Sequence, residues 1–585
     1  MGTGRAPGLT YLQRVVPHFA IPSAVVYLAL RIANDFLPIT IPSWVIIPAT
    51  LFARPIIFFA SSWYSDIANK RDAAARGAVM APMVNASSFK IIGDIVETLK
   101  GGFPAEHFTR WAEECGSTYQ MRMLSTNAIF TEDPEFVKNM LATQFDAFEK
   151  GPTFREQLDS LLGTGVFNAD GEMWKFHRSL TRPFFTRERI SDFEIYDRKA
   201  EASLKLAKQR FSEGYSINAQ DLIGRFTLDS ATEFLFGHSV DSLAAGLPYP
   251  PKFAHLTPAS FHTHPSNIFV QAFGEGQIIA ARRTGQGPDW ALFEFFKDTV
   301  KPYRDVVDEF TIPVIREAVE RREKMKDVKS DGWGTLLESL LDETHDPQIL
   351  KDELVNLLVA GRETTMAFLT FAVYMISEHP EFETRLRQEI YDKVGPSGRP
   401  TYENVRELKF MRAFLNGSEA VSPCADQHEE EHQASCDPEQ ASRQAPDLRA
   451  REHDLHVRRD QHAPAHRPLG PDAMVFDPDR FLDERLHKYL TPNPFIFSPF
   501  NAGPRICLGQ QFAYHEATFY LIRLLQHFTE FKLDTETNKP PPASWAHAKD
   551  RKKVEKIHLM SHLNMFVPGG LWLRMKEIQP GEVNL

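Results

Sequence analysis

The sequence has few cysteines and no excess of positive charge, and each deficit excludes a class of protein. Only four cysteines occur in 585 residues, and they are widely scattered: Cys115, Cys424, Cys436 and Cys507. They are too few for a disulfide scaffold, so we expect a reducing environment for most of the chain. The formal net charge is −11, and no basic stripe dominates the sequence. We therefore expect no nucleic-acid partner.

The sequence also lacks an uncharged apolar run of about 20 residues, the usual length of a membrane-spanning helix. The two most apolar N-terminal runs, 20–32 and 44–60, each contain one arginine, and Pro48 and Pro55 should kink a helix. The absence of a small-residue cleavage site argues against a removed signal peptide. We expect residues 1–65 to anchor the chain across a membrane or in its interface, with Lys70, Arg71 and Arg76 on the cytoplasmic side. The alternative is a buried hydrophobic arm.

Apolar residues at three- and four-residue spacing predict a mainly helical chain from about residue 66 to 416, without internal repeats. The clearest helix begins at Asp346-Pro347, an N-cap followed by proline, and ends at Pro380. Its length of about 48 Å is enough to cross a whole domain. Near the C-terminus, runs 565–567 and 571–574 flank Pro568-Gly569-Gly570 and predict a β-hairpin. We expect a mainly α fold with a small β-rich portion.

Cys507 lies in the stretch FNAGPRICLG, directly before a segment with the pattern of a helix. Amide donors at a helix N-terminus favour an anion, as a thiolate ligand to iron requires. Gly503 and Gly509 allow the backbone to pass close to a flat cofactor, Phe500 can cover the sulfur, and Arg505 can pair with a carboxylate. The alternative is a small buried cysteine beside a helix. Agreement of the whole pattern favours the iron ligand.

This stretch resembles the haem-binding signature of cytochrome P450 enzymes, and the resemblance extends over most of the chain. It implies the cytochrome P450 fold, haem b as cofactor, and Cys507 as the iron ligand. The segment from Trp174 to Arg178 matches the Trp-x-x-x-Arg motif, whose two residues contact a haem propionate in the family. The resemblance gives Arg505 the same role. Tryptophan and arginine one helical turn apart are common, so this motif counts only together with Cys507.

The sequence Ala360-Gly361-Arg362-Glu363-Thr364-Thr365 is similar to the oxygen-activation motif of the family. An acid and an alcohol beside the iron, Glu363 and Thr364, can relay through water the two protons that reduced dioxygen requires. Gly361 can open the helix there, with a local widening where a hydroxyl bonds the backbone. The alternative is a solvated glutamate on a helix face. Retention of both groups argues against haem-thiolate isomerases and dehydratases, which do not need this relay.

Three runs, GTGVFNADGEMWKFHRSLTRPFF, FDPDRFLDERLHKYLTPNPFIF and HLNMFVPGGLWLRM, resemble fungal microsomal members related to alkane and fatty-acid hydroxylases. This resemblance implies a monooxygenase that inserts one oxygen atom from O2 into a fatty acid, an alkane or an aromatic hydrocarbon. Electrons are expected from NADPH through an NADPH-cytochrome reductase. We expect the chain in the endoplasmic reticulum membrane, with the catalytic domain, residues 66–585, facing the cytosol.

The chain departs from the family after Asn416, where the family has a Glu-x-x-Arg motif and this sequence continues with Gly417. The later arginine of the same charge network is present as Arg480. A buried arginine without its partners would cost about 3–5 kcal/mol. Two hypotheses follow: an active monooxygenase, or a non-catalytic chain that cannot retain haem.

Residues 418–469 are foreign in composition, because they contain no Phe, Tyr, Trp, Ile, Met, Lys, Asn or Thr. Such a segment is typical of disorder. We predict a frame slip in the gene model, within 417–469. A one-base shift with suitable synonymous codons turns 418–429 into Leu-Arg-Leu-Phe-Pro-Pro-Ala-Pro-Ile-Asn-Thr followed by the start of an Arg codon. The same shift turns 453–469 into a strand-like run that leads into Gly470.

The same segment offers a rival interpretation as a zinc site. Cys424, His428, His432 and Cys436 recur every four residues and would share one face of a helix. Pro423 and Pro438 lie on either side of them, however, and limit the length of such a helix. A histidine-rich sequence is also typical of off-frame translation. We therefore favour the frame slip.

Overall fold

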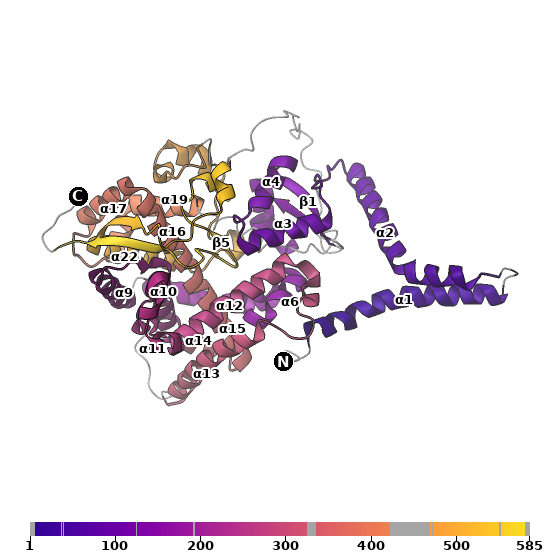
Figure 1. Cartoon of the computed structure of the whole chain (residues 1–585), viewed down its shortest axis with the longest axis horizontal. Coiled ribbons are helices and arrows are strands. Elements are labelled where there is room, and N and C mark those ends of the chain that lie inside the picture. Colours follow the sequence, from indigo (N-terminus) through magenta and orange to yellow (C-terminus); the bar gives the residue numbers. More distant parts are fainter. Residues whose placement is uncertain are drawn as a thin grey trace.

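The computed structural model describes residues 6–36, 38, 40–123, 126–190, 193–324, 335–421, 469–470, 472–548 and 551–579. These residues form a mainly helical body, from which two N-terminal helices project as a long arm (Figure 1). The arm consists of α1 (Pro7–Phe36) and α2 (Ser43–Ala75). The fold is therefore mainly α with a small β-rich portion, as predicted.

The first half of the body contains short and medium helices around one two-stranded sheet. These elements are α3 (Ser88–Gly101), α4 (Glu106–Cys115), β1 (Thr118–Met123), β2 (Thr126–Thr131), α5 (Pro134–Lys138), α6 (Gly151–Leu162), α7 (Gly171–Thr181), α8 (Arg187–Ile190), α9 (Glu194–Ser212), β3 (Ile217–Asn218), α10 (Ala219–Phe236), α11 (Ala259–Thr263), α12 (Pro265–Gly285) and α13 (Lys301–Lys324).

The second half contains the longest helical run and the helix that follows Cys507. Its elements are α14 (Leu336–Glu343), α15 (Pro347–Leu358), η8 (Val359–Glu363), α16 (Thr364–Glu378), α17 (Pro380–Lys393), α18 (Tyr402–Glu407), α19 (Lys409–Val421), α22 (Gln510–His527), β4 (Phe528–Leu533), β5 (Met560–Ser561), β6 (Met565–Phe566) and β7 (Trp572–Glu577).

The predicted long helix is present and crosses the core. The Asp346 carboxylate caps it by accepting from the backbone N–H groups of Gln348 and Ile349, at 2.8 and 3.4 Å. The chain then runs through α15, a π-helical turn (η8) and α16 before Pro380 opens the next helix. Nearly every residue of α16 is buried, because it packs against α10, α19 and α22. This helix divides the interior and supplies one wall of the site.

The predicted C-terminal β-hairpin is wrong. The two runs are strands, and Gly569 and Gly570 form the turn with positive φ values of 85° and 88°. However, β6 pairs with β5, whereas β7 lies between β3 and β4 in a three-stranded sheet. The first run pairs with the strand just before it in the chain, whereas the second pairs with strands distant in sequence, so the two short runs do not select each other.

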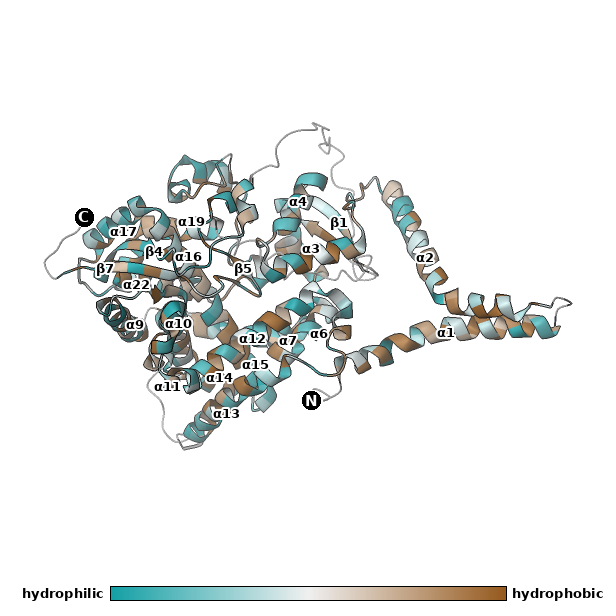
Figure 2. Ribbon diagram, viewed as in Figure 1, coloured by the Kyte–Doolittle hydropathy of each residue, from teal (hydrophilic) through white to brown (hydrophobic). Residues whose placement is uncertain are grey.

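The apolar surface of the N-terminal arm is exposed. The 18-residue apolar windows of α1 and α2 are 0% and 11% buried, and both helices are long and apolar enough to cross a membrane. Hydrophobic residues occupy much of both helices, and hydrophilic residues become more frequent toward the end of α2 (Figure 2). This exposure contradicts the alternative of a buried hydrophobic arm. Proline lies inside both helices, at Pro17 and Pro22 in α1 and at Pro48 and Pro55 in α2, and α2 changes direction along its length (Figure 1).

Candidate active site

A large cavity lies between the long helix, α6, α7 and the loop that precedes α22. Its empty volume is about 1880 Å³, including space open to solvent. Six of the predicted site residues line it: Arg178, Thr364, Phe500, Arg505, Cys507 and Gly509. Trp174, Gly503 and Glu363 are described by the structure but lie outside the lining.

Cys507 faces this cavity from a loop that is held by a backbone hydrogen bond on one side and by helix α22 on the other. Its backbone N–H donates to the Phe500 carbonyl at 2.9 Å, and α22 begins three residues later, at Gln510. Burial raises the pKa of the Cys507 thiol, although the Gly509 backbone N–H and the Arg178 charge act in the opposite direction. The helix N-terminus therefore does not make Cys507 acidic by itself. A coordinating metal ion deprotonates a thiol outright, so ligation would supply the missing stabilisation of the thiolate.

The two glycines near Cys507 differ in how much space a side chain would have. Gly503 has φ +64°, and a Cβ there would lie 1.8 Å from the Leu141 carbonyl oxygen, so only glycine fits. A Cβ at Gly509 would make ordinary contacts, 3.7 Å from Phe185 and 3.8 Å from the Cys507 sulfur. Gly503 is therefore required by the close approach of the chain at Leu141, whereas the prediction that both glycines let the backbone pass close to a flat cofactor stays a prediction.

Two arginines and one tryptophan form a cationic, aromatic group beside the cavity. The Arg178 guanidinium donates to the Ile506 carbonyl at 2.6 Å, which ties α7 to the cysteine loop. The guanidinium carbons of Arg505 and Arg178 lie 4.7 and 5.9 Å from the centre of the buried Trp174 ring. Burial lowers the pKa of both arginines, which nevertheless stay charged near neutral pH. Three predicted cofactor-binding residues therefore gather at one edge of the site.

Asp170 organises this edge and was missed in the sequence. Its nearly fully buried carboxylate accepts from Arg505 at 2.8 Å and from the backbone N–H groups of Lys150 and Gly151 at 3.0 Å each. It thereby joins the cysteine loop to the start of α6. The only local signal is an acidic residue just before α7, and this signal equally fits an ordinary helix start.

The helix widens at the predicted position beside Thr364. Val359–Glu363 form a π-helical turn, and the Thr364 hydroxyl donates to the Ala360 carbonyl at 2.5 Å. Gly361 and Thr364 both face the cavity. The prediction of a local widening with a hydroxyl bonded to the backbone is confirmed. The cavity that Cys507 lines therefore also carries an alcohol, in an irregular stretch of helix.

Glu363 lies differently from its neighbour. Its side chain is buried, is absent from the cavity lining and forms an ion pair with Arg362. Burial lowers the pKa of Arg362 to about 10. Glu363 is therefore not a solvated surface acid, and it also does not share the cavity wall with Thr364.

The start of the foreign segment reaches the cavity as well. Helix α19 continues to Val421, and the buried Glu419 side chain lines the site. Burial raises the pKa of Glu419 to about 7. The segment predicted to be off-frame thus places a carboxyl group in the cavity that contains Cys507.

Arg480 does not incur the cost expected of an unpartnered buried arginine, and that expectation is wrong. Its guanidinium donates to the carbonyls of Leu469, Asp472 and Val475 at 3.2, 2.7 and 2.9 Å, and the Asp472 carboxylate lies 3.6 Å away. Main-chain carbonyls therefore satisfy the charge where the family motif is missing. The residues of the proposed zinc site lie outside the described part of the chain.

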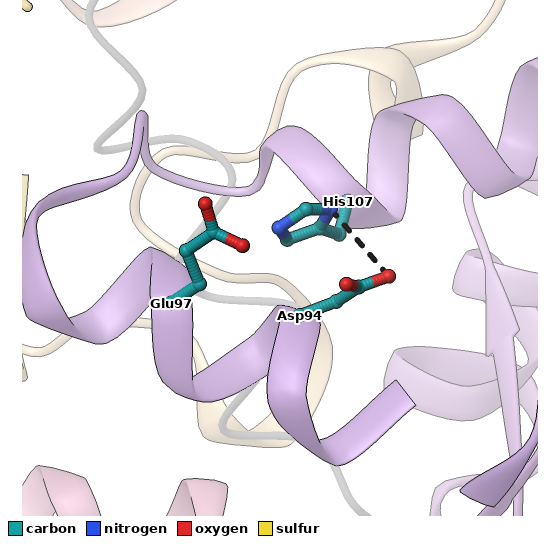
Figure 3. Close-up of side chains that lie close together, drawn as sticks. All are labelled: Asp94, Glu97 and His107. Atoms are coloured by element: carbon teal, nitrogen blue, oxygen red, sulfur yellow. Dashed lines mark ion pairs between the residues drawn. The ribbon is translucent and has the colours of Figure 1, made fainter. Parts of the chain in front are cut away.

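A second group of polar side chains, Asp94, Glu97 and His107, lies between α3 and α4 (Figure 3). Their possible ligand atoms are within 4.8 Å of one another. Asp94, however, already accepts from Lys90 at 3.0 Å and from Arg110 at 2.8 Å. Because two cations already neutralise the Asp94 carboxylate, we interpret the group as an ion-pair cluster that joins the two helices.

A cysteine before a helix, on the wall of a cavity that a widened helix also lines in a mainly helical body, points to the class of haem-thiolate proteins. The family model described as Cytochrome P450 matches residues 85–418 and 470–555. The chain belongs to the cytochrome P450 family, whose members are oxidoreductases that bind haem b through a cysteine thiolate. The matched ranges omit 419–469, which nearly coincides with the segment that is foreign in composition.

Individual fungal proteins are similar over most of the chain. Cytochrome P450 monooxygenase pvhE of Talaromyces variabilis is 30% identical over 469 residues, covering 75% of this chain and 81% of that protein. Cytochrome P450 52A1 of Candida tropicalis is 33% identical over 440 residues, covering 72% and 76%. Cytochrome P450 52A9 of Candida maltosa is 32% identical over 436 residues, covering 72% and 80%.

Proposed function

We propose that this protein is a membrane-bound monooxygenase that inserts one oxygen atom from O2 into a C–H bond of a long apolar substrate. One observation carries the proposal: Cys507 and Thr364 line the same cavity, one on the loop before α22 and the other beside the π-helical turn. Haem b supplies the redox chemistry of oxygen when bound. Cys507 is the proposed iron ligand.

The remaining predicted residues fit the haem in different ways. Arg178 and Arg505 are the proposed partners of the propionates, and Trp174 supports both guanidinium groups from behind. The main-chain path at Gly503 has no room for a side chain. Phe500 lines the cavity and packs on Tyr514 with ring centres 5.0 Å apart, so it can shield the sulfur. Gly509 donates its N–H toward the sulfur.

We assign proton delivery directly to Thr364 and only indirectly to Glu363. The Thr364 hydroxyl faces the cavity and donates its proton to the Ala360 carbonyl, so its oxygen is left to accept a hydrogen bond from proton-carrying water and hold that water in the site. Glu363 would have to release its ion pair with Arg362 to reach the same water. We therefore give Thr364 the direct role.

The lining favours an apolar substrate. Seven phenylalanines face the cavity, together with leucine, valine and alanine side chains: Phe154, Phe167, Phe185, Phe234, Phe368, Phe500 and Phe512. Such a wall suits fatty acids, alkanes or aromatic hydrocarbons. Electrons would come from NADPH through an NADPH-cytochrome reductase. Residues 66–585 would form the catalytic domain in the cytosol, held at the endoplasmic reticulum by residues 1–65, a boundary that falls within α2.

A second function, a non-catalytic chain unable to retain haem, is favoured by one observation. Glu419, from the segment outside the family match, occupies the cavity wall. We propose that residues 417–469 arise from a frame slip and that the correct product is the active enzyme. A verified transcript that encodes the segment in the printed frame would refute the slip. A haem-thiolate isomerase or dehydratase remains a third possibility, distinguished by turnover without a reductase.

The carbon-monoxide spectrum of the reduced, purified chain tests the proposal. Thiolate-ligated haem gives the strongly red-shifted Soret band of this family, and we expect that band together with NADPH-dependent oxidation of a long-chain fatty acid by chain plus reductase. Cys507→Ala should abolish the band, whereas Cys115→Ser, at the other described cysteine, should leave it unchanged. A correct-frame chain that lacks the band would refute haem-thiolate function. If the chain with the present sequence lacks the Soret band and the chain with the frame-corrected segment 417–469 has it, the non-catalytic interpretation of the present sequence would be supported.

A further inference from the structure

The arm formed by α1 and α2 is attached to the body at both of its ends. At the start of α1, the Gly8 backbone N–H donates to the Phe295 carbonyl at 3.2 Å, and Arg14 forms an ion pair with Glu156 at 2.7 Å. A Cβ at Gly8 would lie within 2.4 to 2.7 Å of Phe295, so the two chains touch closely. The Tyr11 hydroxyl also bonds Asp289. The first turns of α1 therefore lie on the body.

The other end of the arm is attached through α2. The Asp66 carboxylate accepts two hydrogen bonds from the Arg122 guanidinium of β1, at 2.8 and 2.9 Å. Between these attachments the two helices leave the body and lie side by side near the tip, after which α2 bends away from α1 on its way back to the body (Figure 1). The arm is therefore a hairpin whose two ends are on the same side and whose tip, where α1 ends at Phe36 and α2 begins at Ser43, is remote from the body.

The surface between the attachments fits a lipid bilayer. Large apolar side chains are exposed along both helices, among them Phe19 at 53%, Leu28 at 57%, Leu51 at 69% and Phe59 at 70%. Arg54 is the one charged residue in the run 44–60, and its guanidinium lies over the rings of Phe19 and Phe58 at 5.5 and 6.0 Å. Aromatic faces thus accompany the cation inside the hairpin.

More basic residues lie at the attached ends of the arm than near its tip. Arg14 lies at the start of α1, and Lys70, Arg71 and Arg76 lie at the end of α2. Near the tip, Arg31 is followed closely by Asp35. Lysine and arginine are retained on the cytoplasmic side of a membrane. The distribution of basic residues and the contacts with the body are independent observations, and both favour placing the two ends of the hairpin on the same side of the membrane.

We propose that α1 and α2 enter the membrane together as a helical hairpin, so that the start of α1 lies on the same face of the membrane as the catalytic domain. A single-span anchor would instead put the start of α1 on the opposite face and separate it from Phe295 and Glu156. The inference rests on the proposed membrane anchoring. Extraction of sealed microsomes with alkaline carbonate tests the membrane anchoring by itself. Release of the full chain into the supernatant would refute both the anchoring and the hairpin. Retention in the membrane would support the anchoring and leave the topology to be decided by the next experiment.

Cross-linking across the two attachments decides the topology. In sealed microsomes, Arg14→Cys with Glu156→Cys should be joined by a short bis-maleimide, because the two native side-chain ends meet and are each about half exposed. Asp66→Cys with Arg122→Cys is the positive control, since both topologies keep this pair together. Phe36→Cys with Glu156→Cys is the negative control, about 33 Å further along α1. Mass spectrometry identifies the linked peptides, and each single-cysteine variant gives the background from native cysteines.

A second readout does not depend on cysteine chemistry. An epitope placed before Ala6 should be removed by protease added outside sealed microsomes, without detergent. A protected epitope, together with a linked Asp66–Arg122 pair and no link between positions 14 and 156, would overturn the hairpin. Removal of the epitope and linkage at both attachments would establish it.

Discussion

The Thr364 hydroxyl donates to the Ala360 carbonyl at 2.5 Å, at the point where the long helix changes from a π-helical turn to an α-helix. A threonine hydroxyl that bonds the carbonyl four residues earlier bends or loosens a helix, and a π-helical turn adds space there. Because both features face the Cys507 cavity, the irregular backbone and the alcohol that we propose for proton delivery belong to one local structure.

Replacing Thr364 with valine should uncouple NADPH consumption from product formation. Valine keeps the shape and removes the hydroxyl, so protons would no longer be delivered at a fixed position. General acid–base groups contribute about 10²–10⁴-fold. We expect product per NADPH to fall at least about tenfold. Thr364→Ser, which retains a hydroxyl, should keep most of the coupling, and equal losses in both variants would contradict a role for the hydroxyl.

The two glycines beside Cys507 should respond differently to alanine. Gly503→Ala combines positive φ with a Cβ that would overlap the Leu141 carbonyl, and backbone strain alone costs about 1–3 kcal/mol. We expect a clearly lower thermal midpoint and weaker haem retention. Gly509→Ala meets only ordinary contacts and should change stability by less than about 1 kcal/mol. Thermal unfolding measures the stability of both variants. Comparable losses of stability would show that the contact of the added Cβ with Leu141 does not determine the stability of this loop.

Removal of the Asp170 carboxylate should loosen the edge of the site that carries Arg505. Asp170→Ala leaves two backbone donors and a largely buried guanidinium without their acceptor, which costs about 3–5 kcal/mol when one partner of a buried pair is deleted. Chemical unfolding and haem titration should both report the loss. Asp72→Ala is the matched control, because its ion pair with Arg76 is exposed and such pairs are worth about 0–1 kcal/mol. A variant at Asp170 as stable as that control would contradict the bracing role.

Local chemistry in the sequence was sufficient for the features that depend on neighbours in the chain. Asp346 and Pro347 define the start of the long helix, and Gly361 with Thr364 defines its widening. Asp170 could not be recognised, because its acceptor role depends on Arg505, which is 335 positions away. The pairing of β7 with β3 and β4 is equally non-local. The direction of Glu363 depends on helix register, which a π-helical turn shifts.

Glu419 should make the stability of the printed chain depend on pH. Burial raises its folded-state pKa to about 7 from an ordinary value of 4.5, so the folded chain holds a proton that the unfolded chain releases. This stabilisation is complete below about pH 4.5 and is lost as the pH rises through about 7, a change of about 3 kcal/mol at 1.36 kcal/mol per pH unit. Denaturant unfolding in detergent at pH 5 and pH 8 should therefore show a lower midpoint at pH 8. Glu419→Gln should remove most of this difference, whereas Glu172→Gln, at a side chain that is 88% exposed, should not. If the pH dependence is unchanged in Glu419→Gln, the carboxyl group is not buried in the cavity, and the start of the foreign segment does not continue α19 into the site.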